Sequence, residues 1–232
     1  MHFLLYSYLS YIDRISSLQL QYWGWGVVLT IQKIVNMTEM ERYRMAVSNY
    51  AEGDGVNYLF HNRGNEHALI ILSNIFRNAK SHIRIAANRL YNDEVVNTKE
   101  YIDSMKTFLD REGSLLSILI TKRPTIEEVQ EHGPENTFYW MLYNHPAYRQ
   151  GRVTIKEGEG NSFKDADGNQ VDFCTGDDRM FRMEQDVKER QAIANFRDPA
   201  YTGQLIKVFD EVYPRLNSVV KLGDYYQIYQ EK

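Results

Sequence analysis

The stretch DDRMFRME, residues 177–184, contains a turn followed by a strand and indicates the fold class. Two consecutive aspartates favour a tight turn, and the residues after them alternate between apolar and charged side chains. Successive side chains of a strand point to opposite faces, so Phe181 and Met183 are expected on one face. Arg182 and Glu184 then share the other face, where they can pair with each other or with a ligand. The plainer interpretation is a solvated or ion-paired face of a sheet.

Short strands surround this stretch in the sequence. Their predicted ranges are 152–157, 170–175, 180–184 and 191–196, with turns at 167–168 and 177–178. A helix is predicted over about 200–216, because apolar residues recur there at helical spacing.

Helices and strands alternate on the N-terminal side of these strands. The spacing of apolar residues predicts helices over about 66–79 and about 101–109, the second followed by Gly113 as a stop signal. Strands are predicted at 81–87 and 115–121, the second apolar enough to be buried on both faces. Pro124 opens another helical stretch, and a further helix is predicted over 137–144. This order indicates an α/β (α+β) fold, with a mixed β-sheet flanked by helices on both faces.

The composition excludes several classes of protein. The chain is 43% hydrophobic with a net charge of −4, which is unlike a disordered chain. It has one cysteine, so a disulfide framework and multi-cysteine metal sites are excluded. A sequence pI near 5.9 removes the general basic signal for nucleic-acid binding. A cytoplasmic location is therefore expected.

The first 36 residues form an apolar appendage that differs from the rest of the chain. Their most apolar run, 22–31, is about half the length of a membrane span, so no span is predicted. Two interpretations fit: residues 3–20 form a helix docked on the main body or on a partner, or the native chain starts at Met37. We expect a helical or loop lead-in at 37–63, the main domain at 64–216 and a tail at 217–232.

Single residues that often carry chemistry have simpler explanations here. The acidic segment 165–169 resembles a calcium loop, but its glycine comes too early, so a hairpin tip is predicted. The histidines lack metal-ligand spacing, and Cys174 within a strand is typical of a small buried apolar residue. We expect no metal and no cofactor.

The order of the elements, with DDRMFRME at 177–184 and ANFRDP at 194–199, resembles one half of the phospholipase D-like fold. The resemblance covers about residues 64–213. It implies two motifs on the last strands, His-x-Lys-x-x-x-x-Asp and, after a further strand, Gly-Ser-x-Asn.

The residues at these motif positions depart from the family pattern. Placing the motif aspartate on Asp177 puts the histidine position on Gln170 and the lysine position on Asp172. The asparagine position falls on Asn195, while residues 192–193 are Ala-Ile in place of Gly-Ser. In the family the histidine attacks phosphorus and the lysine helps to hold the phosphate. Glutamine cannot be that nucleophile, and an aspartate repels phosphate.

The resemblance therefore implies a domain without the family's catalysis. We predict a scaffold, regulatory or binding module that forms a homodimer or binds a protein partner. The predicted cleft residues are Gln170, Asp172, Asp177, Arg179, Arg182, Glu184 and Asn195. The first alternative is nucleic-acid or nucleotide-phosphate binding by Arg179, Arg182, Arg190 and Arg197, with Arg84 and Arg89 nearby. The second is a metal-dependent phosphodiesterase or other hydrolase with a relocated site, built on Asp172, Asp177, Asp178 and Glu184.

Overall fold

The computed structural model describes residues 37–53, 57–132, 137–158, 163–164, 168, 170–186 and 191–226. The contacts divide the chain into two units, 1–46 and 47–232, and the boundary falls within helix α3 (Glu39–Glu52). The described part of the first unit is the start of this helix, where the hydroxyl of Thr38 accepts a hydrogen bond from the Glu41 backbone N–H. The second unit contains the sheet and the candidate site.

A mixed β-sheet forms the centre of the second unit. In the described part of the chain it has eight strands in the order β1-β7-β6-β5-β2-β3-β4-β8. Their ranges are β1 Phe60–Arg63, β2 His82–Ala87, β3 Leu115–Ile120, β4 Val153–Glu157, β5 Phe173–Gly176, β6 Met180–Asp186, β7 Gln191–Asn195 and β8 Ser218–Val219. Strands β2, β3 and β4 are parallel to one another, and the remaining pairings are antiparallel.

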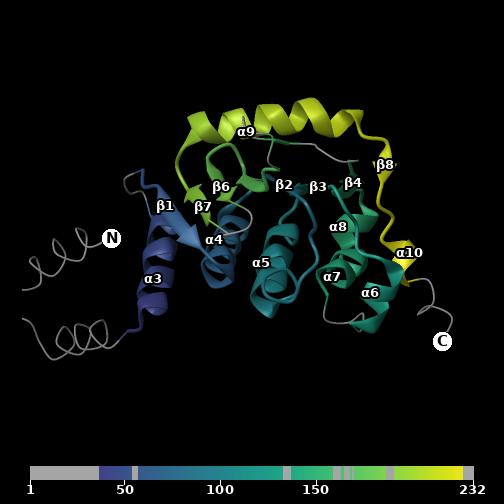
Figure 1. Ribbon diagram of the computed structural model, residues 1–232, viewed down its shortest axis with the longest axis horizontal. Helices are drawn as coiled ribbons and strands as arrows, with labels where there is room; N and C mark the ends of the chain where they lie inside the picture. Colours follow the sequence, from purple (N-terminus) through teal and green to yellow (C-terminus); the bar gives the residue numbers. More distant parts are fainter. Residues whose placement is uncertain are drawn as a thin grey trace, which may run out of the picture. The chain divides into compact units, whose positions relative to one another are not determined.

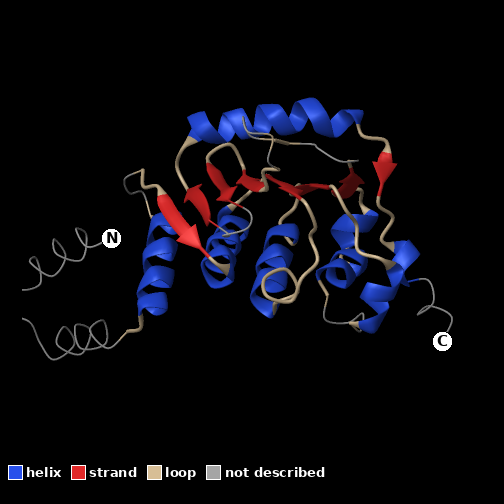
Figure 2. Cartoon of the chain, viewed as in Figure 1, coloured by secondary structure: helices blue, strands red, loops and turns tan. Residues whose placement is uncertain are grey.

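Helices cover both faces of this sheet (Figure 1). One long helix, α9 (Pro199–Val212), lies along one face and continues into a 3-10 turn, η2 (Tyr213–Arg215). The opposite face is covered by α4 (Asn65–Asn78), α5 (Lys99–Leu109), α6 (Ile126–Glu131), α7 (Phe138–Asn144) and α8 (Pro146–Arg149). The short helix α10 (Gly223–Tyr226) follows β8 near the end of the described chain. The predicted α/β class with helices on both faces is confirmed, and Figure 2 shows the layers by colour.

The strand register assigns side chains to the two faces. Cys174 lies opposite Ile85 on one side and Arg182 on the other, so these three share the face covered by α4 and α5. Phe173 and Met183 lie opposite each other on the other face, where they pack in the cluster that includes Phe209 of α9. A Cβ at Gly176 would lie only 2.7 Å from Cγ2 of Ile75, so glycine allows α4 to pack closely on β5.

Most of the predicted elements are present; β8, α8 and α10 were not predicted, and three further differences follow. Strand β5 begins at Phe173, and Gln170 forms only an isolated bridge with Lys164. The C-terminal helix ends at Val212, because Pro214 lies in the 3-10 turn that follows. The sequence did not predict β1, since four residues are too few to show a period. Residues 1–36, Arg190, segment 165–167 and Asn169 lie outside the described residues.

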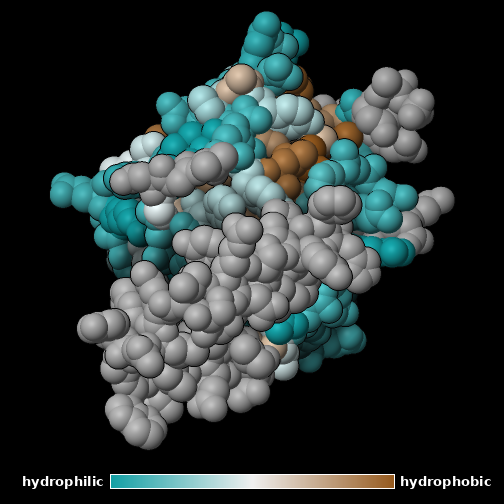
Figure 3. All heavy atoms as spheres, turned by 90° about the vertical axis from the view of Figure 1, so that its left-hand side faces the viewer, coloured by the Kyte–Doolittle hydropathy of each residue, from teal (hydrophilic) through white to brown (hydrophobic). Residues whose placement is uncertain are grey.

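The described surface is mainly polar where it can be seen from the side of β1. Figure 3 shows a largely hydrophilic surface there, with one compact apolar area. Among the described helices, none is both long enough and apolar enough to span a bilayer.

Candidate functional site

A pocket of about 310 Å³ lies where β2 ends, between the sheet and helices α4 and α5. Its apolar wall includes Ala68, Leu72, Ile85, Val95, Val96 and Tyr101. Its polar wall includes Asn88, Arg89, Asp172, Arg182 and Glu184. We call it the Arg182 pocket. Ligands of α/β sheets commonly bind in crevices just beyond the carboxyl ends of parallel strands, which is where this pocket lies.

Arg182 and Glu184 form a buried ion pair in the wall of this pocket. Nη1 and Nη2 of Arg182 both donate to Oε1 of Glu184 at 3.0 Å, and Arg182 is only 5% exposed. Nε of Arg182 is buried and has no hydrogen-bond partner. A buried charge is costly unless it is paired and fully hydrogen-bonded, so this guanidinium has donors to spare beside an empty volume.

Asp172 lies beside this pair and is held by the loop after β2. The backbone N–H of Asn88 donates to both of its carboxylate oxygens at 3.0 Å, and Nε2 of Gln170 donates to Oδ1 at 3.0 Å. Burial is the main cause that raises the pKa of Asp172 to about 6; the neighbouring charge of Glu184 also raises it, while the hydrogen bonds from Asn88 and Gln170 and the charge of Arg182 lower it. The pocket is therefore lined by two carboxylates and by two guanidinium groups, those of Arg182 and Arg89.

Cys174 also lines the pocket, between Ile85 and Arg182 in the sheet. Its thiol is free and buried, and burial raises its pKa to about 12. The thiolate is the reactive form of cysteine, so this residue acts as a small apolar part of the wall.

Asp177 lies at the other end of β5, in the turn to β6. Its backbone has φ 52°, and its carboxylate accepts hydrogen bonds from the backbone N–H groups of Lys80, Ser81 and His82 at 2.8–3.1 Å. Burial alone would raise the pKa of Asp177, but these hydrogen bonds lower it by more. Asp177 thus fastens the β5–β6 turn to the start of β2.

Arg179 and Asn195 also lie away from the pocket. Nη1 of Arg179 donates to the carbonyl of Phe196 at 3.0 Å. Ala194 is the residue of β7 that lies opposite Arg182, so the pleat directs Asn195 to the other face. The Asn195 Oδ1 atom accepts from the Arg197 backbone N–H at 2.8 Å.

Of the seven residues predicted for a cleft, the structure brings together Gln170, Asp172, Arg182 and Glu184. Asn88 was missed by sequence reasoning although it contributes both backbone contacts to Asp172. The signal that could have found it is its position directly after the last residue of a parallel strand, where ligand-binding loops begin.

The arginines considered for phosphate binding do not share one face. Arg84 lies on the α9 face, where Nε and Nη2 donate to Asp210 at 2.9 and 3.0 Å. Arg182 lies on the opposite face, and Arg89 pairs with Glu128. Of the carboxylates considered for a metal, Asp172 and Glu184 line the Arg182 pocket, whereas Asp177 lies at the other end of β5. In the described part of the chain no three His, Cys, Asp or Glu side chains are grouped so that they could hold a metal ion.

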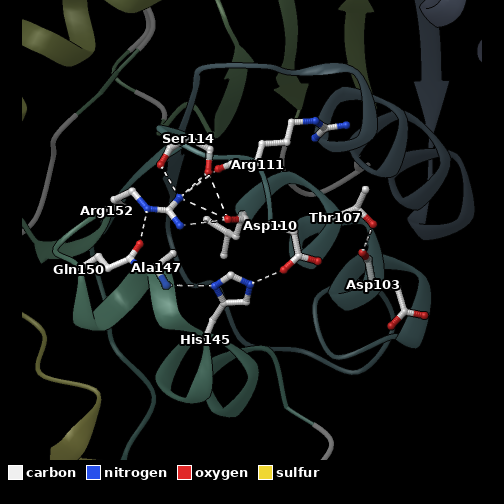
Figure 4. A network of polar contacts seen from close by, with 10 residues as sticks. Asp103, Thr107, Asp110, Arg111, Ser114, His145, Ala147, Gln150 and Arg152 are labelled. Atoms are coloured by element: carbon white, nitrogen blue, oxygen red, sulfur yellow. Dashed lines mark hydrogen bonds and ion pairs between the residues drawn. The ribbon is translucent and has the colours of Figure 1, made fainter.

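A second polar network surrounds Arg152 near the end of α5 (Figure 4). The Arg152 guanidinium donates to the backbone carbonyls of Leu109, Arg111 and Ser114 at 3.0–3.3 Å. Nε2 of His145 contacts Asp110 at 3.1 Å, and its Nδ1 accepts from the Ala147 backbone N–H. Carbonyls at a helix C-terminus lack partners within the helix, so this network has a structural role.

Comparisons with known proteins assign no family to the chain. No family model matches it, and no curated protein matches it.

Solved structures with a similar arrangement include three proteins at low sequence identity. TrmBL2, an archaeal chromatin protein described as binding DNA, is 12% identical, with a TM-score of 0.49 over 84% of this chain and 67% of its own. Nuc, a phospholipase D family member from Salmonella typhimurium, is 9% identical, with a TM-score of 0.44 over 70% and 97%. Phosphatidylserine synthase from Haemophilus influenzae is 10% identical, with a TM-score of 0.48 over 75% and 42%. These proteins differ in what they are described as doing, so the similarity assigns no activity.

Proposed function

We propose that the chain is a non-catalytic, phospholipase D-like binding domain that holds a small polar ligand in the Arg182 pocket. The observation that carries the proposal is the buried guanidinium of Arg182, a residue that lines a cavity of about 310 Å³ and whose buried Nε has no hydrogen-bond partner. Buried polar groups in folded proteins are nearly always hydrogen-bonded, so an unpartnered donor on a residue that lines a cavity favours a ligand-binding role for that residue.

The pocket lacks the groups that phosphoryl chemistry of this family would use. None of the described residues that line it is a histidine or a lysine. Gln170, at the position that the resemblance assigns to the nucleophile, donates its amide N–H to Asp172. Asp172 and Glu184 would repel a phosphate. These features support binding without phosphodiester cleavage.

The proposed setting is the cytoplasm, with the pocket serving a scaffold or regulatory role in a homodimer or with a protein partner. The expectation of pairing comes from the family resemblance. Light scattering of the full chain tests it, and a monomeric mass at all concentrations would contradict it.

The experiment for the main proposal has two arms on the full chain. Hydrolysis of bis(p-nitrophenyl) phosphate and of single-stranded DNA should not exceed the blank. Turnover that Asp172→Ala abolishes, and that the control Asp210→Asn preserves, would overturn the non-catalytic assignment. In the second arm, a panel of cationic, neutral and anionic fragments is titrated while backbone amide NMR shifts are recorded. At least one class should shift Asn88 and Glu184 in a saturable manner, and no shift from any class would contradict ligand binding.

A further inference from the structure

We propose that the ligand of the Arg182 pocket is a small aliphatic amine with a hydrogen-bond acceptor next to its ammonium group, such as an amino alcohol. This inference rests on the proposed function, since it names the ligand class of the same site. It follows from the unused hydrogen-bonding groups, the charge balance and the shape of the pocket.

The unused donors of Arg182 require an acceptor on the ligand. A guanidinium has five N–H donors, and the described contacts of Arg182 use Nη1 and Nη2 on a single oxygen, Oε1 of Glu184. Nε is buried without a partner. A ligand hydroxyl or carbonyl oxygen would accept a hydrogen bond from the N–H groups of this guanidinium that Glu184 does not use.

The charge balance of the pocket requires a positive charge on the ligand. Asp172 and Glu184 supply two carboxylates against the one guanidinium of Arg182. Oε2 of Glu184 has no hydrogen-bond partner among the described residues, whereas Oε1 holds both bonds from Arg182. An uncompensated charge in a buried site is costly, so an ammonium group that donates to these carboxylates would stabilise the site.

The other charge at the pocket is already neutralised. Arg89 lines the pocket but pairs with Glu128 of α6, which does not line it. Hydrogen bonds from Arg89 and from the Thr125 backbone lower the pKa of Glu128 to about 2, so this partner stays ionised. Tyr91, beside Arg89, has a pKa of about 12 because of burial and is uncharged. The excess negative charge therefore remains with Asp172 and Glu184.

The rest of the wall fits a branched aliphatic body. Ala68 and Leu72 come from α4, Ile85 from β2, and Val95 and Val96 from the loop before α5. A volume of about 310 Å³ lies at the lower end for ligand pockets, so it suits a compact molecule with a few carbon atoms beside its polar end. Leucinol has this shape and carries the ammonium and hydroxyl groups on adjacent carbons.

The test compares three molecules with one carbon skeleton. Leucinol is the cation, 4-methylpentane-1,2-diol the neutral analogue and 2-hydroxy-4-methylpentanoate the anion. Each is titrated into the full chain by calorimetry and followed by backbone amide NMR. At about pH 7.5 leucinol should bind at least about tenfold more tightly than either analogue, because only it neutralises the carboxylates. Its affinity should fall on lowering the pH to about 5, since Asp172 then takes up a proton that competes with the ammonium group.

Two variants locate the site. Glu184→Gln removes one carboxylate with little change of shape and should weaken leucinol binding by about tenfold or more. Leu72→Phe reduces the cavity from the α4 side without changing a charge, so it tests the site should Glu184→Gln fail to fold. Asp210→Asn, which alters the Arg84 ion pair on the other face, is the matched control and should bind as the natural chain does.

The outcomes separate this inference from the proposed function. Tighter binding of the diol or the hydroxy acid, with shifts at Asn88 and Glu184, overturns the amine but leaves a binding pocket. Leucinol binding that Glu184→Gln and Leu72→Phe do not weaken also overturns the inference, because the site lies elsewhere. Absence of binding by all three molecules and by the wider fragment panel overturns both.

Discussion

Two arginines of this protein have different surroundings, although both lie on the side of the sheet that carries α4 to α8. Arg152 uses all three of its nitrogens: Nη1 and Nη2 donate to the end of α5, and Nε donates to Gln150 (Figure 4). Arg182 lines a cavity and donates from two nitrogens to one carboxylate oxygen, and its buried Nε has no partner. The fold itself supplies hydrogen-bond acceptors for the Arg152 guanidinium, whereas it leaves hydrogen-bond donors of the Arg182 guanidinium without a partner.

The difference separates a structural arginine from a binding one. Backbone carbonyls at a helix end are fixed in place and need donors, so Arg152 stabilises the fold whether or not a ligand is present. A buried ion pair such as Arg182–Glu184 contributes little net stability for its cost and is weak evidence of a stabilising role. Its spare donor and the excess carboxylate are better explained by a ligand.

The largest expected effect comes from breaking the Arg182 pair. Arg182→Met leaves Glu184 buried without its partner and should lower the free energy of unfolding by about 3–5 kcal/mol in urea denaturation. The double variant Arg182→Met/Glu184→Leu should recover most of this loss, because it removes both charges. A double variant as unstable as the single one would show that the ion pair itself stabilises the fold. Such a result would contradict the distinction between a structural Arg152 and a ligand-binding Arg182.

Replacing Asp172 should have a smaller effect on the free energy of unfolding, and this effect should depend on pH. Its folded pKa, about 6, is above the ordinary carboxyl value, so the folded state binds the proton more tightly. The stability gained from this tighter proton binding is complete at low pH and is lost as pH rises through about 6, an effect on the order of 3 kcal/mol. Asp172→Asn should therefore gain stability relative to the natural chain between about pH 4 and pH 7, measured by urea denaturation.

The partly buried His82 also makes the free energy of unfolding depend on pH, but in the opposite direction. Its effect must therefore cancel when Asp172→Asn is compared with the natural chain. Burial and, to a smaller extent, the charge of Arg84 lower the pKa of His82 to about 4, so its contribution to stability grows as pH rises. The natural chain and Asp172→Asn both contain His82, so the difference between their free energies of unfolding reports on Asp172 alone. A difference that does not change with pH would contradict the buried environment assigned to Asp172.

Arg152→Met should have a lower cost than Arg182→Met. The carbonyls that lose Arg152 lie at a helix end, where water can replace part of the interaction, and charge-assisted hydrogen bonds contribute about 1.5–3 kcal/mol. Urea denaturation measures this loss, and fragment binding to the Arg182 pocket should be unchanged. A loss of fragment binding would mean that the two networks are coupled.

The smallest effect is expected for Asp210→Asn on the α9 face. Its carboxylate is 48% exposed and bonded to Arg84, and partly exposed ion pairs contribute about 0–1 kcal/mol. The thermal unfolding midpoint should therefore shift by only a few degrees, about 1–4 °C. A decrease of the midpoint larger than that caused by Arg152→Met would contradict the expectation that the partly exposed Arg84–Asp210 pair contributes less stability than the Arg152 network.

The sequence could predict the fold class and part of the site. Alternation alone placed Arg182 and Glu184 on one face of β6, and the continuous apolar run identified β3 as a strand buried on both faces. Alternation could not show that α4 and α5 cover that face and leave a cavity there. This depends on Leu72 and Tyr101, which lie about eighty residues or more before Arg182 in the chain.

The motif positions show why the rest of the site could not be predicted. Asp172 and Asp177 are five residues apart, and at about 3.3 Å per residue an extended chain separates them by about 16 Å. The structure accordingly places them at opposite ends of β5, one held by Asn88 and the other by the backbone of Lys80–His82. Closeness in a sequence motif therefore does not imply closeness in a cleft.

The most direct measurement is the pKa of Asp172 itself, followed by carboxyl carbon NMR in the full chain with and without saturating leucinol. Without ligand, the pKa should be near 6. With leucinol it should fall by about one unit or more, because the ammonium group favours the charged carboxylate. An unchanged pKa in the presence of bound leucinol, or a rise, would contradict the claim that the Arg182 pocket binds an amine.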